Sequence, residues 1–174
     1  QEQVPLSPED GWPLLHDTLT KALAELLARR EAEGAALGKE LRVLLAALGE
    51  HVGVMVGRGP AALERKQQRL RERVQSLLGA QPLDEGRLAT EVAMWAEKSD
   101  ITEELARLHA HMAEFTRLLG EGGPVGRTLD FLIQEMNREV NTVGSKADDL
   151  ELSQAAIAAK STLEKLREQV QNIE

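Results

Sequence analysis

The sequence has no cysteine and no tyrosine, and aromatic residues make up only 2% of its 174 residues. Without cysteine, disulfides and thiolate zinc sites are excluded, and a reducing compartment is compatible. Stacking surfaces of the kind that bind single-stranded nucleic acids are scarce. No apolar run approaches the roughly 20 residues of a membrane-spanning helix, and no segment at the start is typical of a signal peptide. We therefore expect no membrane partner.

Charge is the next constraint on function. The formal net charge is −8, which argues against a broad surface that coats nucleic acid. A nucleic-acid partner would need local basic patches, or a metal that neutralises carboxylates. The hydrophobic content of 42% is enough for the core of one helical domain or two small ones.

Apolar residues recur at helical spacing along nearly the whole chain, and no segment has a convincing strand alternation. The sequence therefore predicts an all-α fold, in which long antiparallel helices precede a C-terminal multi-helix domain. We place an amphipathic arm or hairpin at residues 1–79 and the C-terminal domain at residues 80–174. The first apolar stripe consists of Trp12, Leu15, Leu19, Leu23, Leu26 and Leu27.

Glycine and proline predict where the helices end. The runs at residues 57–60 (Gly-Arg-Gly-Pro) and 79–82 (Gly-Ala-Gln-Pro) predict two breaks, with a charged helix between them. The interleaved acids of that helix favour a solvated face over a track for phosphates. Further helices are expected over residues 85–97, from about 100 to 119, and from about 150 to 173. Another helix is expected between the loop GEGGPVG and a break at residue 144.

Two of these helices carry acids and a histidine at one-turn spacing. Glu104 and His111 lie on one, Glu135 and Glu139 on the other, and the short loop between the helices predicts antiparallel packing. The four side chains would then face one another and could hold a divalent cation, for which carboxylates favour Mg²⁺ or Mn²⁺. Spacing alone favours the alternative, a solvated strip with local ion pairs.

Longer motifs identify a family. The segments DITEELARLHAHMAEF, LDFLIQEMNREVNTVGSK and REQVQNIE closely resemble the C-terminal region of the YicC family, and RREAEGAAL and RLRERV resemble its middle region more weakly. The resemblance implies a bacterial, cytoplasmic, stress-induced endoribonuclease that forms ring-like hexamers around RNA. Because family members begin with a further mixed α/β region, it also implies an N-terminally truncated fragment, with weak or no cleavage on its own.

The matching positions supply the candidate site, although Ala110 stands where the family commonly has serine. Combined with their chemistry, the resemblance assigns catalysis to Glu104, His111, Glu135 and Glu139. It assigns RNA binding to Arg107, Asn137, Arg138, Asn141 and Lys146. It also points to Glu103, Asp130, Gln134 and Ser145, without distinct roles.

Two mechanisms and a second function remain open. In one mechanism His111, Glu135 and Glu139 hold a divalent metal, Mn²⁺ or Mg²⁺, that activates water. In the other, without metal, His111 is the acid and a glutamate the base, and the product is a cyclic phosphate. The alternative function is a non-catalytic helical oligomerisation or scaffold module. Net acidity, long amphipathic helices and few aromatics are the observations that favour it.

Overall fold

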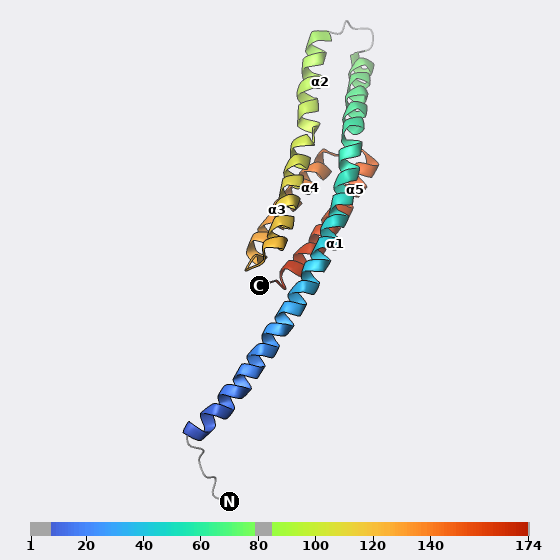
Figure 1. Ribbon diagram of the computed structural model, residues 1–174. Helices are drawn as coiled ribbons and strands as arrows, with labels where there is room; N and C mark the ends of the chain where they lie inside the picture. The colour runs from blue at the N-terminus through green and yellow to red at the C-terminus, as the bar shows by residue number, and fades with distance from the viewer. Residues whose placement is uncertain (1–7, 79–84, 174) are drawn as a thin grey trace, which may run out of the picture. The chain divides into compact units, whose positions relative to one another are not determined.

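The computed structural model describes residues 8–78 and 85–173, and every regular element within these ranges is an α-helix (Figure 1). The all-α prediction is confirmed. The break predicted at residues 79–82 lies outside the described residues. No described helix is both long and apolar enough to cross a membrane. The helices are α1 (Pro8–Leu78), α2 (Glu85–Ser99), α3 (Thr102–Glu121), α4 (Gly126–Lys146) and α5 (Leu150–Val170).

The chain divides into two compact units, residues 1–39 and residues 40–174. The division falls inside α1, so the later part of this helix belongs with α2 to α5, whereas the sequence suggested a boundary at residue 79. In the first unit the predicted apolar stripe is present but exposed to solvent. Its members are Trp12, Leu15, Leu19, Leu23, Leu26 and Leu27.

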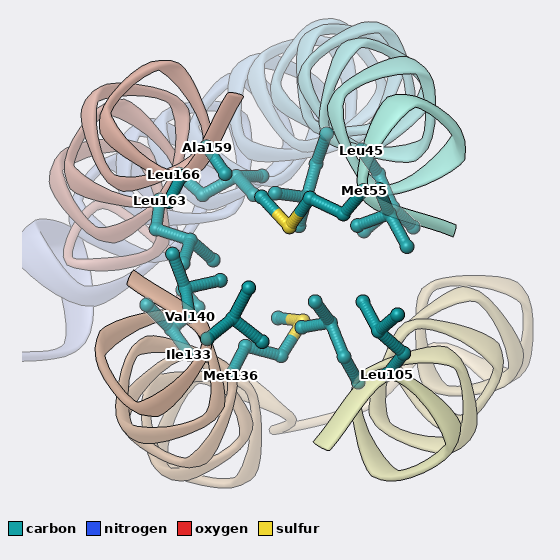
Figure 2. Packing of buried hydrophobic residues seen from close by; sticks show 14 of the residues in the cluster. Leu45, Met55, Leu105, Ile133, Met136, Val140, Ala159, Leu163 and Leu166 are labelled. Atoms are coloured by element: carbon teal, nitrogen blue, oxygen red, sulfur yellow. The ribbon is translucent and has the colours of Figure 1, made fainter. Parts of the chain in front are cut away.

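The core of the second unit is shared by four helices (Figure 2). Leu45 and Met55 of α1 point toward Leu105 of α3, Met136 of α4 and Leu163 of α5. Side chains at 3–4 spacing bury one face of each helix, which is the pattern that the sequence predicts for α3 and α4. The predicted core residues of α4 are all buried: Leu129, Leu132, Met136, Val140 and Val143.

The predicted break at residues 57–60 is wrong, because α1 is helical throughout this run. Proline within a helix costs about 3 kcal/mol or more, so local propensity favours a break. Packing on both sides of the run opposes it, since Met55 and Ala62 are buried in the shared core. A β-carbon on Gly59 would lie 3.3 Å from Ile101 Cδ1. Glycine therefore lets α1 and the start of α3 approach closely.

The connections between helices are fixed by glycine and by capping carboxylates. Gly122 and Gly123 adopt positive φ angles of 73° and 86° in the predicted loop between α3 and α4. Asp100 accepts hydrogen bonds from the backbone N and the hydroxyl of Thr102 at 2.9 and 2.6 Å. These bonds lower the pKa of Asp100 below its ordinary value. Asp100 thus satisfies one backbone donor in the first turn of α3.

Asp149 performs the same task at the start of α5. Its carboxylate accepts a hydrogen bond from the backbone N of Leu152 at 3.0 Å. It also pairs with Arg65, and Arg58 lies 3.5 Å away, so the cap of α5 is joined to α1. The bond from Leu152 is the main reason that the pKa of Asp149 is lowered, and the two arginines add to it.

Replacing Phe115 tests the shared core. Phe115 is fully buried, whereas Phe131 is 57% exposed. Phe115→Ala should lower the free energy of unfolding by about 3 to 5 kcal/mol, measured by urea denaturation followed by circular dichroism. Phe131→Ala is the matched control and should change it by about 0.5 kcal/mol at most. Equal losses in the two variants would contradict the buried placement of Phe115.

Asp149 gives a prediction about pH. Because its folded-state pKa is depressed, its stabilisation is present above the ordinary value of 3.8 and is lost as pH falls through the lower folded-state value. Asp149→Ala should therefore be less stable than the parent at pH 6, and the difference should shrink below pH 3.8. Urea denaturation at a series of pH values measures this. A difference that does not change with pH would exclude the ionised carboxylate as its cause.

Candidate functional site

Two ion pairs, Arg107–Glu139 and Lys146–Glu104, join α3 to α4, and we call these four residues the clamp. Arg107 of α3 donates to both carboxylate oxygens of Glu139 of α4, with Nε–Oε1 at 2.7 Å and Nη2–Oε2 at 3.0 Å. It also pairs with Glu103 one turn away. Glu139 is buried, and these hydrogen bonds raise the pKa of Arg107 above its ordinary value, with Glu139 as the main cause. The predicted antiparallel packing of the two helices is confirmed by this contact.

A second charge pair lies next to the first, where α3 begins and α4 ends. Glu104 is buried, and its Oε1 accepts a hydrogen bond from Lys146 Nζ at 2.9 Å, with Arg107 Nη2 at 3.7 Å. Lys146 also donates to the backbone oxygen of Asp100 at 2.7 Å. The last turn of α4 is therefore fastened to the first turn of α3. The other oxygen, Glu104 Oε2, is buried without a hydrogen-bond partner.

His111 and Glu135 lie further along the same two helices. Each is one turn from a member of the clamp, His111 four residues after Arg107 and Glu135 four residues before Glu139. Because α3 and α4 are antiparallel, this register puts His111 and Glu135 opposite each other. Both are half-buried, and Glu135 pairs with Arg138 at 2.6 Å on its own helix. An imidazole and a carboxylate at facing positions of two packed helices, both with access to solvent, are groups that can carry out acid–base chemistry.

The amide side chains assigned to RNA binding lie apart from this interface. Asn141 donates to Asn137 Oδ1 at 3.4 Å, and it borders a shallow recess with Ser153 and Lys160 toward α5. Arg138 is 73% exposed. The reason is the helical period, which places Asn137 and Asn141 more than a quarter turn from both Glu135 and Glu139. The other positions that the resemblance indicated also make local bonds: Gln134 to Asp130, and Ser145 to the Thr142 carbonyl.

The hydrogen bonds of the clamp also limit which carboxylate oxygens are available to bind a metal. Within the described ranges no three His, Asp or Glu side chains group as metal ligands would. Of the predicted ligands His111, Glu135 and Glu139, the last has both oxygens bonded to Arg107. Glu135 Oε1 is bonded to Arg138. Because both oxygens of Glu139 are engaged by a cation of the protein itself, this set of three does not fit a divalent metal as it stands.

Sequence reasoning missed a cavity of about 500 Å³ beside the clamp. Lys66, His109 and Lys146 line it together with residues of α1 and of the junction between α2 and α3. His109 Nδ1 is 2.8 Å from the Leu105 carbonyl, one turn earlier in the same helix. One feature of the sequence could have indicated this cavity. Lys66 lies one turn after Ala62, so the two residues share the buried face of α1.

The fold and site define a helical protein with paired acids, a histidine and basic side chains on two facing helices. The family model described as "Endoribonuclease YicC-like, C-terminal" matches residues 56–174. The chain therefore belongs to the YicC-like family, as the motifs indicated.

Two curated relatives are both named "Probable endoribonuclease YicC". The relative from Clostridioides difficile (strain 630) is 38% identical over 164 residues, which cover 94% of this chain and 56% of the relative. The relative from Haemophilus influenzae (strain ATCC 51907 / DSM 11121 / KW20 / Rd) is 36% identical over 152 residues, covering 87% and 52%. The chain thus spans about half the length of these relatives.

Removing Lys146 tests the clamp. Lys146→Met leaves Glu104 buried without its closest cation and should lower the free energy of unfolding by roughly 3 kcal/mol in urea denaturation. Adding Glu104→Gln to that variant should restore part of the loss. Arg138→Met removes the more exposed pair with Glu135 and should cost about 1 kcal/mol at most. Equal losses in the two single variants would contradict the assignment of a buried ion pair.

Proposed function

We propose that this chain is the helical part of an endoribonuclease that cleaves RNA phosphodiester bonds at the α3–α4 interface. The observation that carries the proposal is the register of the two helices, which sets His111 opposite Glu135 one turn from the clamp. The names of the two relatives support it. The clamp itself is stationary and holds the two helices in this register.

The reaction that suits these two groups is transesterification within the RNA strand. Glu135 accepts the proton of a ribose 2′-hydroxyl, and the 2′-oxygen attacks the neighbouring phosphorus. The bond from phosphorus to the 5′-oxygen breaks, and His111 donates the proton that this oxygen takes up. The products are a 2′,3′-cyclic phosphate and a free 5′-hydroxyl. Histidine suits such a task because imidazoles exchange protons near neutral pH.

The clamp residues have a positioning role in this proposal. Arg107 and Lys146, which the resemblance assigned to RNA, already bind Glu139 and Glu104. Glu104 and Glu139 then serve as anchors for these cations. Arg138, with Asn137 and Asn141 on the outer side of α4, is left to contact the RNA backbone beyond the cleaved bond.

Dependence on Mn²⁺ or Mg²⁺, which the carboxylates and the histidine suggested, is a separate proposal. A metal at Glu139 would have to displace Arg107 from both carboxylate oxygens. The acid–base route has no step that needs a metal and leaves a cyclic phosphate. Attack by metal-activated water leaves no cyclic phosphate, so the end groups of the products distinguish the two routes.

We also propose that the chain works on cytoplasmic RNA as a homo-oligomer, with a hexamer implied by the family. The exposed apolar side chains of the first unit, among them Trp12, Leu19 and Leu26, support an assembly that covers them. The absence of cysteine is compatible with a reducing compartment.

End-labelled RNA incubated with excess protein under single-turnover conditions tests the reaction, because weak cleavage is then measurable. The chain should cleave RNA in EDTA and leave cyclic phosphate ends. His111→Gln and Glu135→Gln should each slow cleavage by about 100-fold or more. His51→Gln and Glu164→Gln are matched controls outside the interface and should cleave at the parent rate.

The outcomes separate the competing ideas. If folded His111→Gln and Glu135→Gln proteins cleave at the parent rate, these residues are not the acid and base. Cleavage that requires Mn²⁺ and leaves no cyclic phosphate would replace the acid–base route by metal-activated water. Absence of cleavage by the full-length protein under every metal condition would favour the scaffold module.

A further inference from the structure

The cavity beside the clamp has the size and lining of a small-molecule site. Its volume of about 500 Å³ lies within the range of roughly 300 to 1,000 Å³ that ligand pockets occupy. Much of its wall is apolar, supplied by Val56, Leu63, Ile101, Leu105 and Leu152 from four parts of the chain. Polar and charged side chains lie among them, including Lys66, His109 and Lys146. Such a wall accepts a flat, mostly apolar body.

Lys66 provides a positive charge that no carboxylate neutralises. Its Nζ donates to the backbone oxygen of Lys146 at 3.3 Å and lies 4.6 Å from the ring centroid of Trp95. Lys66 is half-buried, and none of the ion pairs among the described residues includes it. Lys146 differs, since its charge is opposed by Glu104. An ammonium has three donors, so Lys66 can still bind an anion.

The acids of the cavity are engaged elsewhere. Asp100 accepts both hydrogen bonds of Thr102, and Asp148 lies 3.6 Å from Arg69 Nη1. His109 uses Nδ1 on the Leu105 carbonyl, which leaves Nε2 for a ligand. The lining thus combines a free cation, a histidine nitrogen and an apolar wall.

We infer that this cavity binds one nucleotide of the RNA strand at a point away from the bond that is cleaved, because Lys146 lies eleven residues, about 16 Å of helix, from Glu135 along α4. The base lies against the apolar wall, and the phosphate accepts a hydrogen bond from Lys66. A nucleotide combines a flat body with an anion at the size that the cavity offers. Lys146 lines the cavity and also holds Glu104, so the nucleotide lies directly beside the clamp. The inference rests on the proposed function, because the nucleotide is taken to be part of the RNA that the endoribonuclease cleaves.

Binding of mononucleotides tests the cavity without any cleavage. In a Trp12→Phe background Trp95 is the only tryptophan, and its fluorescence reports a ligand at Lys66. Uridine and adenosine 5′-monophosphate should change its emission saturably. Ribose 5-phosphate, which has no base, should bind at least 10-fold more weakly. A short RNA oligonucleotide should displace the mononucleotide.

Calorimetry on variants locates the site. Lys66→Met should weaken mononucleotide binding at least 10-fold, whereas Arg71→Met, an exposed position of the same helix outside the cavity, should leave it unchanged. In the cleavage assay, Lys66→Met should raise the protein concentration needed for half-maximal rate and leave the maximal rate unchanged. Equal effects of the two variants would overturn the inference.

The remaining outcomes distinguish this inference from the proposed function. If RNA is cleaved but mononucleotides do not bind, the cavity assignment fails and the endoribonuclease stands. If mononucleotides bind through Lys66 but RNA neither displaces them nor is cleaved, the proposed function fails, and with it the assignment of an RNA strand to the cavity. Equal binding of ribose 5-phosphate would exclude the apolar wall as a base site.

Discussion

The structure of the second unit depends on how two buried carboxylates are neutralised. Glu104 and Glu139 lie largely out of water, and an ionised carboxylate in such a place is strongly unfavourable unless a cation and hydrogen bonds compensate it. Arg107 and Lys146 provide that compensation from adjacent positions of the α3–α4 interface, one on each helix. A slip of one turn would separate both pairs at once. The register is therefore set by charge as well as by apolar packing, and the facing positions of His111 and Glu135 follow from it.

Helical spacing was enough to predict most of the second unit. Apolar residues on α3 and α4, the short loop between the helices and the cap at Asp100 are all local signals. The failure at residues 57–60 shows the limit of such signals. Gly-Arg-Gly-Pro is a break by local propensity, but the buried neighbours Met55 and Ala62 gain more from a continuous helix. That gain comes from residues distant in sequence.

The candidate site was predicted in part for the same reason. One-turn spacing brought the acids and the histidine to facing helices, but it could not show that Arg107 occupies both oxygens of Glu139. The cavity was missed altogether, because its lining comes from α1, from the α2–α3 junction and from the ends of α4 and α5. Lys66 alone looks like any lysine on a charged helix. Only its position beside Trp95 and the Lys146 backbone makes it distinctive.

The continuity of α1 through Gly59 and Pro60 has a consequence for how the chain folds. Pro60 removes one hydrogen bond of the helix and crowds the preceding turn, so local hydrogen bonding favours this stretch less than the rest of α1. Ile101, about forty residues later, lies close to Gly59 and supplies packing that the local sequence lacks. Completion of α1 is a long-range event, so the second unit should acquire its helices cooperatively rather than one by one from the N-terminal side.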